Sequence, residues 1–262
     1  MEIAGKSAVI TGGAVRIGRA VAIRLGSLGV HVCLHYNSSG DAAEQTITQL
    51  SEFGIRASSV SADFSDPVAA SKRVFDQALE DLGSVDFLVN SAAIFEPSTL
   101  SDLEEAVWDR HLDINLKTPV FLSQKFLDAL PDSRRGHIIN IGDWRALRPV
   151  TGHLAYTVAK AGLAATTRLL AQELAPRIQV NAVAPGAILP APGSSTGEFE
   201  RRAEGIPLQR TGGPDDIADA IEYLLRSDFV TGEVMHVTGR EQLPGHVRDD
   251  HVRVDDPTTG SE

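Results

Sequence analysis

An aspartate, a tyrosine and a lysine between Ile141 and Lys160 have the types and spacing for proton-transfer chemistry. Tyr156 follows Asp143 by thirteen residues, and Lys160 follows Tyr156 by four. Because residues four apart share one face of a helix, the Lys160 ammonium is expected beside the Tyr156 phenol. A cation there favours the phenolate and makes the phenol a better acid near neutral pH. The spacing of Tyr156 and Lys160 therefore predicts proton-transfer chemistry in which the phenol is the acid.

The segment AVITGGAVRIG, from Ala8 to Gly18, has the pattern of a buried strand, a glycine-bearing turn and a helix that opens near Arg16. Gly12 permits a tight turn, and Gly18 lets the helix pack closely on the strand. The free N–H groups and the dipole of such a helix favour a pyrophosphate at its N-terminus. The segment therefore predicts a dinucleotide site.

The second predicted strand ends in LHYNSS, Leu34 to Ser39, and this end indicates which dinucleotide binds. Selectivity for NAD normally rests on a carboxylate at that position, and none is present. Arg16 with a histidine and two serines suits the 2′-phosphate of NADPH, although Arg16 solvated at the helix start is an alternative. Asp63 is placed to meet the adenine edge or to cap the next helix. Asn90, which ends the fourth strand, is expected beside the cofactor ribose.

Short apolar runs rich in β-branched residues alternate with longer amphipathic segments, which is typical of a parallel sheet flanked by helices. We therefore predict one domain over residues 1–241, a Rossmann fold of class α/β with a doubly wound seven-stranded parallel sheet and helices on both faces. The expected strands are Ser7–Thr11, Val30–His35, Ala57–Ser61, Phe87–Asn90, His137–Ile141, Gln179–Val183 and Val234–Val237. The expected helices are Arg16–Leu28, Asp41–Phe53, Pro67–Leu82, Leu103–Leu116, Pro119–Leu130, Gly152–Leu174 and Asp215–Leu225.

Two regions interrupt this order. The stretch Leu189–Gly197, rich in proline, glycine and serine, follows a strand's carboxyl end, where open α/β sheets bind ligands. It is interpreted as a substrate lid, with an inert surface loop as the alternative. Residues 242–262 form a polar tail without periodicity, which is expected to be partly disordered, although its first residues are able to reach a neighbouring subunit.

The composition limits the partners. Of the 262 residues, 42% are apolar and 23% charged, as in ordinary soluble proteins, and no run approaches the ~18 apolar residues of a membrane span. The start of the chain lacks the pattern of a signal peptide, and the single cysteine, Cys33, is expected to be a buried inert thiol, so a cytoplasmic location is predicted. The net charge of −11 argues against nucleic acid as a partner. The scattered histidines predict no metal site.

Six motifs in order resemble the short-chain dehydrogenase/reductase family over nearly the whole chain. The match runs from the glycine turn to a late segment after the sixth predicted strand. The motifs are TGGxxxIG from Thr11, NSAA from Asn90, Asn115 within LDINL, YxxxK from Tyr156, NxxxPG from Asn181 and PLQRTGGPDDI from Pro207.

Within that family the chain is most similar to the pteridine reductases, including bacterial members that reduce dihydropterins such as dihydromonapterin. Arg16 stands in the glycine turn, the second strand reads CLHYNSS, Asp143 replaces the usual catalytic serine, and Phe95 follows Asn90 by five residues. The chain departs from the family pattern at three places. Ser91 stands at the second position of the usual NNAG-type motif, and no threonine follows Pro185 and Gly186. The last strand ends in VTGR, Val237 to Arg240, without the usual aspartate and paired glycines.

The resemblance implies roles for the site residues. Tyr156 is the proton donor, Lys160 binds the nicotinamide ribose and lowers the pKa of the phenol, and Asn115 holds a water or a backbone contact in a proton path. The implied catalytic set is Asp143, Tyr156, Lys160 and Asn115, and the implied substrate-binding set is Arg16, Phe95, Asp143, Trp144 and Tyr156. The residues expected around NADPH are Gly12, Arg16, Ile17, Gly18, His35, Tyr36, Asn37, Ser38, Ser39, Asp63, Phe64, Asn90, Ser91, Ala92, Tyr156, Lys160, Pro185, Gly186 and Ile188.

The carboxylate of Asp143 carries the substrate prediction. A serine suits a ketone, whereas a carboxylate accepts hydrogen bonds from the ring nitrogens and amino group of a pterin, which Phe95 and the nicotinamide would sandwich. We therefore predict NADPH-dependent reduction of a pteridine. The alternatives are a 3-oxoacyl thioester or ketone reductase and a non-catalytic NADPH-binding regulator. Three other interpretations also stay open: Asp143 as a turn cap, Phe95 as core packing, and Trp144 and Arg145 either as substrate contacts or as packing or subunit contacts. Small residues along Gly152–Leu174, with the resemblance, imply a homotetramer.

Overall fold

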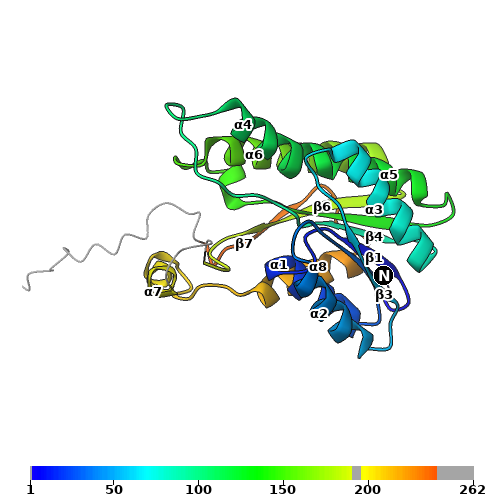
Figure 1. Cartoon of the computed structure of the whole chain (residues 1–262). Coiled ribbons are helices and arrows are strands. Elements are labelled where there is room, and N and C mark those ends of the chain that lie inside the picture. The colour runs from blue at the N-terminus through cyan, green and yellow to red at the C-terminus, as the bar shows by residue number, and fades with distance from the viewer. Residues whose placement is uncertain (1, 191–195, 241–262) are drawn as a thin grey trace, which may run out of the picture.

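The computed structural model describes residues 2–190 and 196–240, and its sheet has seven parallel strands in the order β3-β2-β1-β4-β5-β6-β7 (Figure 1). The strand order reverses between β1 and β4, and open α/β sheets bind ligands at the carboxyl ends of strands at such a switch point. The strands are β1 (Ser7–Ile10), β2 (His31–Tyr36), β3 (Ala57–Ser61), β4 (Phe87–Asn90), β5 (Gly136–Ile141), β6 (Ile178–Pro185) and β7 (Val234–Val237).

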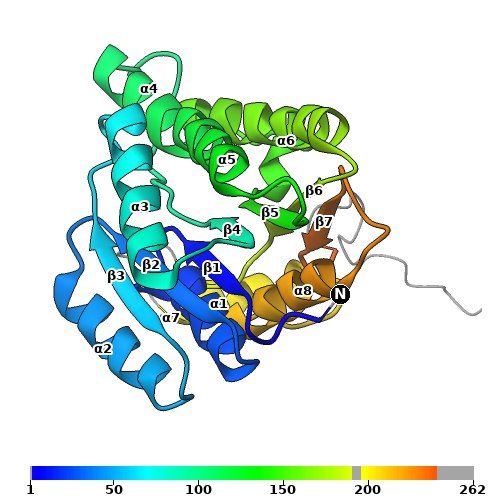
Figure 2. The ribbon, with the colours of Figure 1, turned by 90° about the vertical axis from the view of Figure 1, so that its right-hand side faces the viewer.

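Helices cover both faces of the sheet, as Figures 1 and 2 show. One face carries α1 (Arg16–Ser27), α2 (Gly40–Ser51) and α8 (Pro214–Arg226), and the other carries α3 (Pro67–Leu82), α4 (Glu105–Leu112), α5 (Thr118–Ala129) and α6 (Leu154–Leu174). The predicted doubly wound α/β Rossmann fold is therefore confirmed.

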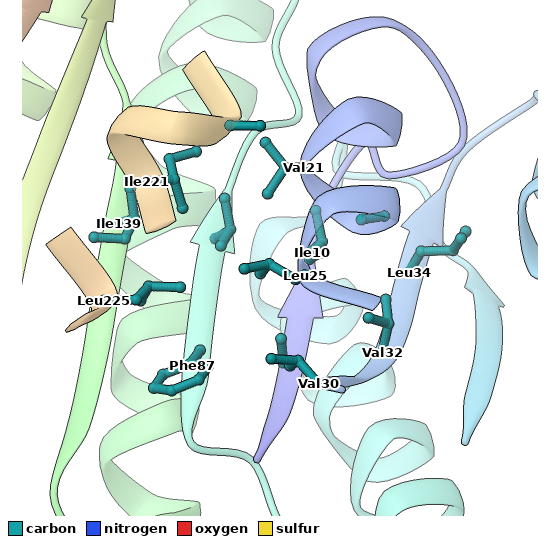
Figure 3. Packing of buried hydrophobic residues seen from close by; sticks show 14 of the residues in the cluster. Ile10, Val21, Leu25, Val30, Val32, Leu34, Phe87, Ile139, Ile221 and Leu225 are labelled. Carbon is teal, nitrogen blue, oxygen red and sulfur yellow. The ribbon is translucent and has the colours of Figure 1, made fainter. Parts of the chain in front are cut away.

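Two hydrophobic layers hold the sheet between its helices. Along β1, Ile10 packs into the layer under α1 and α8, whereas its neighbour Val9 packs into the layer under α3 and α5, because successive side chains of a strand point to opposite faces. Full burial of such an aliphatic side chain stabilises the fold by roughly 1.5–3 kcal/mol. Figure 3 shows the first layer, in which Val21, Leu25, Ile221 and Leu225 from α1 and α8 meet Ile10, Val32, Leu34, Phe87 and Ile139 from the strands and Val30 just before β2.

The helical boundaries differ from the prediction between β4 and β5. The helices predicted to end at Leu116 and to begin at Pro119 are continuous, because a π-helical turn, η1 (Asp113–Lys117), joins α4 to α5. The Thr118 N–H donates to the carbonyl of Asp113, five residues earlier. Pro119 has no N–H to continue the α-helical pattern, which accounts for the wider turn.

Three short elements were not predicted: the 3-10 turns η2 (Trp144–Ala146) and η3 (Arg202–Gly205), and the helix α7 (Thr196–Arg201). The end of the predicted lid, Thr196–Gly197, is therefore the start of α7. Residues 191–195 of the lid and the tail 242–262 lie outside the described residues, so the lid, the disordered tail and the boundary at residue 241 stay predictions. No helix within residues 2–190 and 196–240 has the length and apolar character to cross a bilayer.

Two buried titratable groups lie away from the strand ends that form the ligand site. Cys33 on β2 is buried, and burial raises the pKa of its thiol to about 11, which fits an inert thiol. His137 on β5 is fully buried against the ring of Phe87, and neither ring nitrogen has a hydrogen-bond partner among the described residues. Burial lowers the pKa of His137 to about 4, so its ring is neutral in the folded protein.

The pH dependence of stability is expected to reflect His137. The ordinary pKa of a histidine is 6.5 and that of His137 is about 4 in the folded protein, so the unfolded chain binds more protons between these values and stability falls as the pH falls from 6.5 towards 4. The expected loss at pH 5 is about 2 kcal/mol from this residue. Urea unfolding of His137→Leu at pH 8 and pH 5 should show a smaller loss than the wild type, and an equal loss in both proteins would contradict the assignment.

Candidate active site

A cavity of about 490 Å³ lies at the carboxyl ends of β1, β4, β5 and β6. It brings together residues predicted from segments far apart in the sequence, which places the predicted active site and dinucleotide site in one cleft. The predicted residues that line it are Gly12, Arg16, Ile17, Gly18, His35, Asn37, Asp63, Phe64, Ser91, Ala92, Phe95, Asp143, Tyr156, Lys160, Pro185, Gly186 and Ile188. Tyr36, Ser38, Ser39, Asn90, Asn115 and Trp144 were also predicted at the site but do not line the cavity.

The glycine turn has the close packing that a dinucleotide cradle requires. A Cβ on Gly18 would lie 2.2 Å from the carbonyl oxygen of Gly12, so no larger residue fits there. Gly12 itself has φ +63°, and a Cβ on it would meet the backbone of Ala92 at 3.0 Å. Backbone N–H groups at the start of α1 are therefore able to approach a pyrophosphate. These residues fit an adenine dinucleotide.

Thr11 fixes the two strand ends to one another, and it was not predicted as a site residue. Its hydroxyl oxygen accepts hydrogen bonds from the N–H groups of Ser91 and Ala92, at 2.9 and 3.0 Å. The loop after β4 is thereby held against the glycine turn. Its place in the TGG motif is the only sequence signal for this role.

His35 supports the turn and does not offer a charge to a phosphate. Its Nδ1 accepts from the N–H of Gly12 at 3.3 Å, its Nε2 lies 2.9 Å from the carbonyl oxygen of Ala62, and its ring stacks on Phe64. Burial lowers the pKa of His35 to about 4, so the ring is neutral at pH 7. The expected place of His35 near the cofactor phosphate stays a prediction: the residue lines the cavity, and both of its ring nitrogens bind the backbone.

The side chain of Asn90 does not line the cavity, while the expected place of its backbone beside the ribose stays a prediction. Its Nδ2 donates to Oδ1 of Asn140 on β5 at 2.8 Å, inside the sheet, and Asn140 donates in turn to Thr167 on α6. The side chain of Asn90 therefore ties β4 to β5. Asp63 does line the cavity; its carboxylate accepts from the N–H of Ser65, while Asp66, not Asp63, caps α3.

Arg16 occupies a strained backbone conformation. Its φ is +54°, in the left-handed region, where a residue with a Cβ is disfavoured by roughly 1 kcal/mol or more relative to glycine. The side chain lines the cavity, and its Nη2 donates to the carbonyl oxygen of Pro190 at 2.9 Å. A strained arginine in a position that favours glycine indicates that its side chain has a function.

Replacing Arg16 by glycine is expected to separate the effect of backbone strain on stability from the effect of the arginine side chain on cofactor binding. The melting temperature should be unchanged or higher, because the left-handed residue is removed. The affinity for NADPH should fall about tenfold, the effect of losing one charge-assisted hydrogen bond, while the affinity for NADH stays constant. Fluorescence titration with both dinucleotides measures this. A lower melting temperature with unchanged preference for NADPH would show that Arg16 is only a structural residue.

Asp143, Tyr156 and Lys160 meet at one end of the cavity. The Tyr156 hydroxyl donates to Oδ2 of Asp143 at 2.8 Å, and the Lys160 ammonium donates to the carbonyl oxygen of Ile141 at 2.7 Å. The Nζ of Lys160 lies 5.8 Å from the centre of the Tyr156 ring. Tyr156 and Lys160 share one face of α6, as their spacing predicts, and both are almost fully buried.

The protonation of the pair differs from the expectation. Burial and the negative charge of Asp143 raise the pKa of Tyr156 well above its usual value, so the phenol is protonated at neutral pH. Burial lowers the pKa of Lys160 to about 8, partly offset by Asp143, so most of the ammonium is charged at pH 7. The resemblance implied that Lys160 lowers the pKa of the Tyr156 phenol. In this structure the pKa of Tyr156 is raised instead, because burial and the Asp143 carboxylate outweigh the effect of Lys160.

Asp143 both caps a turn and binds Tyr156. Its Oδ1 accepts from the N–H of Arg145 at 2.8 Å and so caps η2, while its Oδ2 accepts from Tyr156. The turn-cap interpretation and the interpretation as partner of Tyr156 are therefore both correct. Trp144 and Arg145 were both considered as substrate contacts, although only Trp144 was placed in the substrate-binding set; Arg145 lines the cavity and Trp144 does not.

Phe95 lies in the cavity rather than in the core. It is 36% exposed, its ring stacks on His153 at 3.9 Å between centroids, and its edge contact with Tyr156 is 4.7 Å. His153 Nδ1 lies 3.0 Å from the carbonyl oxygen of Glu96, so this histidine fixes the ring of Phe95 beside Tyr156. Sequence reasoning gave His153 no such role; its position three residues before Tyr156 was the available signal.

Asn115 holds the segment that leads to Phe95. It is fully buried in the π-helical turn, and its side-chain amide exchanges two hydrogen bonds of 3.0 Å with the backbone of Ile94. Of the two contacts expected for Asn115, the structure has the backbone contact. Asn115 therefore positions the loop after β4 and does not itself line the cavity.

The fold and the arrangement of Asp143, Tyr156 and Lys160 in this cavity are those of a nucleotide-dependent oxidoreductase. The chain belongs to the short-chain dehydrogenase/reductase family, whose members bind NAD or NADP. The profile described as enoyl-(acyl carrier protein) reductase matches residues 13–239. The 3-oxoacyl-(acyl-carrier-protein) reductase FabG of Staphylococcus epidermidis is 34% identical over 89% of this chain and 98% of its own. The 3beta-hydroxysteroid dehydrogenase 1 of Eggerthella lenta is 35% identical over 93% and 97%.

A solved structure of the FolM alternative dihydrofolate reductase 1 of Brucella canis, complexed with NADP, superimposes with a TM-score of 0.89. It is 35% identical, and the match covers 95% of this chain and 98% of that one. A blue fluorescent protein from a metagenomic library, in complex with NADPH, is 34% identical with a TM-score of 0.83, over 91% of this chain and 98% of its own.

Proposed function

We propose that this protein is an NADPH-dependent reductase of pteridines that converts a dihydropterin to a tetrahydropterin. The observation that carries the proposal is the hydrogen bond from the Tyr156 hydroxyl to the Asp143 carboxylate, in a cavity lined by Phe95. A carboxylate at this place suits a heterocycle with ring N–H and amino donors better than it suits a carbonyl compound. The similarity to the FolM alternative dihydrofolate reductases supports the same substrate class.

The cofactor is NADP(H), which the glycine turn, Arg16 and the absence of a carboxylate at the end of β2 all fit. Gly12, Ile17 and Gly18 would hold the pyrophosphate end, and Pro185, Gly186 and Ile188 the nicotinamide end. When bound, NADPH supplies the hydride for the substrate's C=N bond.

The residues of the chain supply the proton and the orientation. Tyr156 is protonated at neutral pH and donates its proton to the ring nitrogen that gains negative charge. The Lys160 ammonium, held by Ile141, stabilises the phenolate that remains. Asp143 accepts from the substrate and from Tyr156, and Phe95 stacks on the heterocycle, a contact worth roughly 0.5–1.5 kcal/mol beyond area burial.

The second candidate is a 3-oxoacyl thioester reductase. The relatives named FabG, 33–34% identical over 89% of this chain, favour it. Tyr156 and Lys160 would serve a ketone equally well, since a phenol protonates a developing alkoxide as readily as a ring nitrogen. Asp143 does not fit this candidate, because an ionised carboxylate only accepts hydrogen bonds and has nothing to donate to a carbonyl oxygen.

One assay separates the candidates. NADPH oxidation is followed with dihydrobiopterin, dihydromonapterin, dihydrofolate and an acetoacetyl thioester. Oxidation with one or more of the pteridines supports the proposal. Oxidation with the thioester alone would exclude it in favour of the second candidate, and NADPH binding without any oxidation would favour a non-catalytic regulator.

We also propose that the chain forms a homotetramer in the cytoplasm. The apolar side chains Val158 and Leu169, exposed on α6, are consistent with burial against a second copy. Molar mass measured by light scattering checks the assembly.

A further inference from the structure

Arg145 is fixed at the end of the cavity that holds Tyr156. Its side chain is only 19% exposed, and its Nη1 lies 3.6 Å from Oδ2 of Asp143. The guanidinium carbon lies 5.0 Å from the ring centre of Trp144 and 5.5 Å from that of Phe95. Contacts with two rings and a carboxylate restrict the rotamers of this arginine, so its donors point in defined directions.

One donor of Arg145 has no partner. Its Nε is buried and makes no hydrogen bond with any described residue. A guanidinium does not lose its proton, and a buried donor without a partner destabilises the protein unless a ligand or water accepts from it. Asp143 also has unused capacity, because a carboxylate has about four acceptor positions and the hydrogen bonds from Arg145 N and Tyr156 occupy two.

We propose that Arg145 and Asp143 together recognise the lactam edge of the substrate, the ring carbonyl and the adjacent ring N–H of a 2-amino-4-oxopteridine. Arg145 donates to the carbonyl oxygen, and Asp143 accepts from the neighbouring N–H and amino group. This inference rests on the proposed pteridine reduction and narrows it to substrates that carry an oxygen at C4. Arg145 is then the residue that determines specificity, and Trp144 supports it from outside the cavity.

The pairing excludes the corresponding 4-amino compounds. A 2,4-diaminopteridine presents an amino group where the carbonyl was and an unprotonated ring nitrogen where the N–H was. A donor then faces Arg145, which loses its acceptor, and an unprotonated ring nitrogen faces Asp143, which keeps only the 2-amino group as a donor. Sites built to hydrogen-bond one group reject analogues that lack it, for this reason.

The test compares pterin and 2,4-diaminopteridine, which differ in the C4 substituent and in the hydrogen on the adjacent ring nitrogen, by equilibrium binding to the protein loaded with NADP+. The wild type is expected to prefer pterin by about tenfold or more. Arg145→Met should weaken pterin binding about tenfold, leave 2,4-diaminopteridine unchanged and so abolish the preference. Arg148→Met, an exposed arginine three residues later that does not line the cavity, is the matched control and should keep it.

NADPH affinity shows whether each variant is folded. If Arg145→Met does not fold, Arg145→Lys replaces it, because lysine keeps the charge without the forked donors. Equal binding of the two compounds to the wild type would overturn the role of Arg145 and leave pteridine reduction intact. Equal weakening of both compounds in Arg145→Met would also overturn it, because a purely structural residue has that effect. If neither compound binds to a wild type that binds NADPH, the proposed function fails as well.

Discussion

Tyr156→Phe is expected to lower kcat by a factor of about 10²–10⁴ with whichever substrate the wild type reduces, because a positioned general acid contributes that much. The hydroxyl that donates to Asp143 is the only donor lost, and the ring edge that contacts Phe95 remains. Burial and Asp143 hold the pKa of Tyr156 well above its usual value, so the wild-type phenol is protonated throughout the neutral range. The loss should therefore be similar from pH 6 to pH 8.

The measurement is single-turnover oxidation of NADPH in the presence of saturating substrate. Tyr223→Phe, in a half-exposed tyrosine on α8 outside the cavity, is the control and should have wild-type kcat. The affinity for NADPH should change little in Tyr156→Phe, since its ring stays in place. A variant with more than a tenth of wild-type kcat would show that another group supplies the proton.

The fold was predictable because its signals are local. The strand, turn and helix of AVITGGAVRIG follow from steric limits within eleven residues, and the structure places Gly12 and Gly18 where those limits require glycine. The face shared by Tyr156 and Lys160 follows in the same way from helical periodicity.

The side-chain partners were not predictable, because they depend on segments that only the packed sheet brings together. Asn90 was expected at the ribose, but Asn140 lies beside it on β5 and takes its amide. His35 was expected at the phosphate, but the backbone of Gly12 and Ala62 surrounds its ring. Neither Asn140 nor Ala62 is close in sequence to the residue that it binds.

Arg145 shows a third limit. The sequence left Trp144 and Arg145, the two residues after Asp143, open as substrate contacts, and the predicted substrate-binding set named only Trp144. Asp143 caps the 3-10 turn η2, and in this turn Arg145, not Trp144, lines the cavity. Periodicity carries no information about a three-residue turn, so only the structure distinguishes the two neighbours.

Asp143→Ser should lower pterin reduction about a hundredfold or more, since each hydrogen bond to a charged group contributes roughly 1.5–3 kcal/mol and the carboxylate makes one to Tyr156 and is proposed to make another to substrate. Serine is the informative replacement because it is also a good N-cap, so η2 and the position of Arg145 are retained. Loss of the carboxylate should also bring the pKa of Tyr156 down towards its usual value, because Asp143 contributes to raising it.

The same variant tests the choice between the two substrate classes. A serine hydroxyl donates to a carbonyl oxygen, so any reduction of the acetoacetyl thioester should be retained or should rise while pterin reduction falls. Asp109→Ser, in an exposed aspartate on α4, is the matched control and should leave both rates unchanged. The role of Asp143 would be refuted by full pterin reduction in Asp143→Ser, because the carboxylate would then be only the cap of a turn.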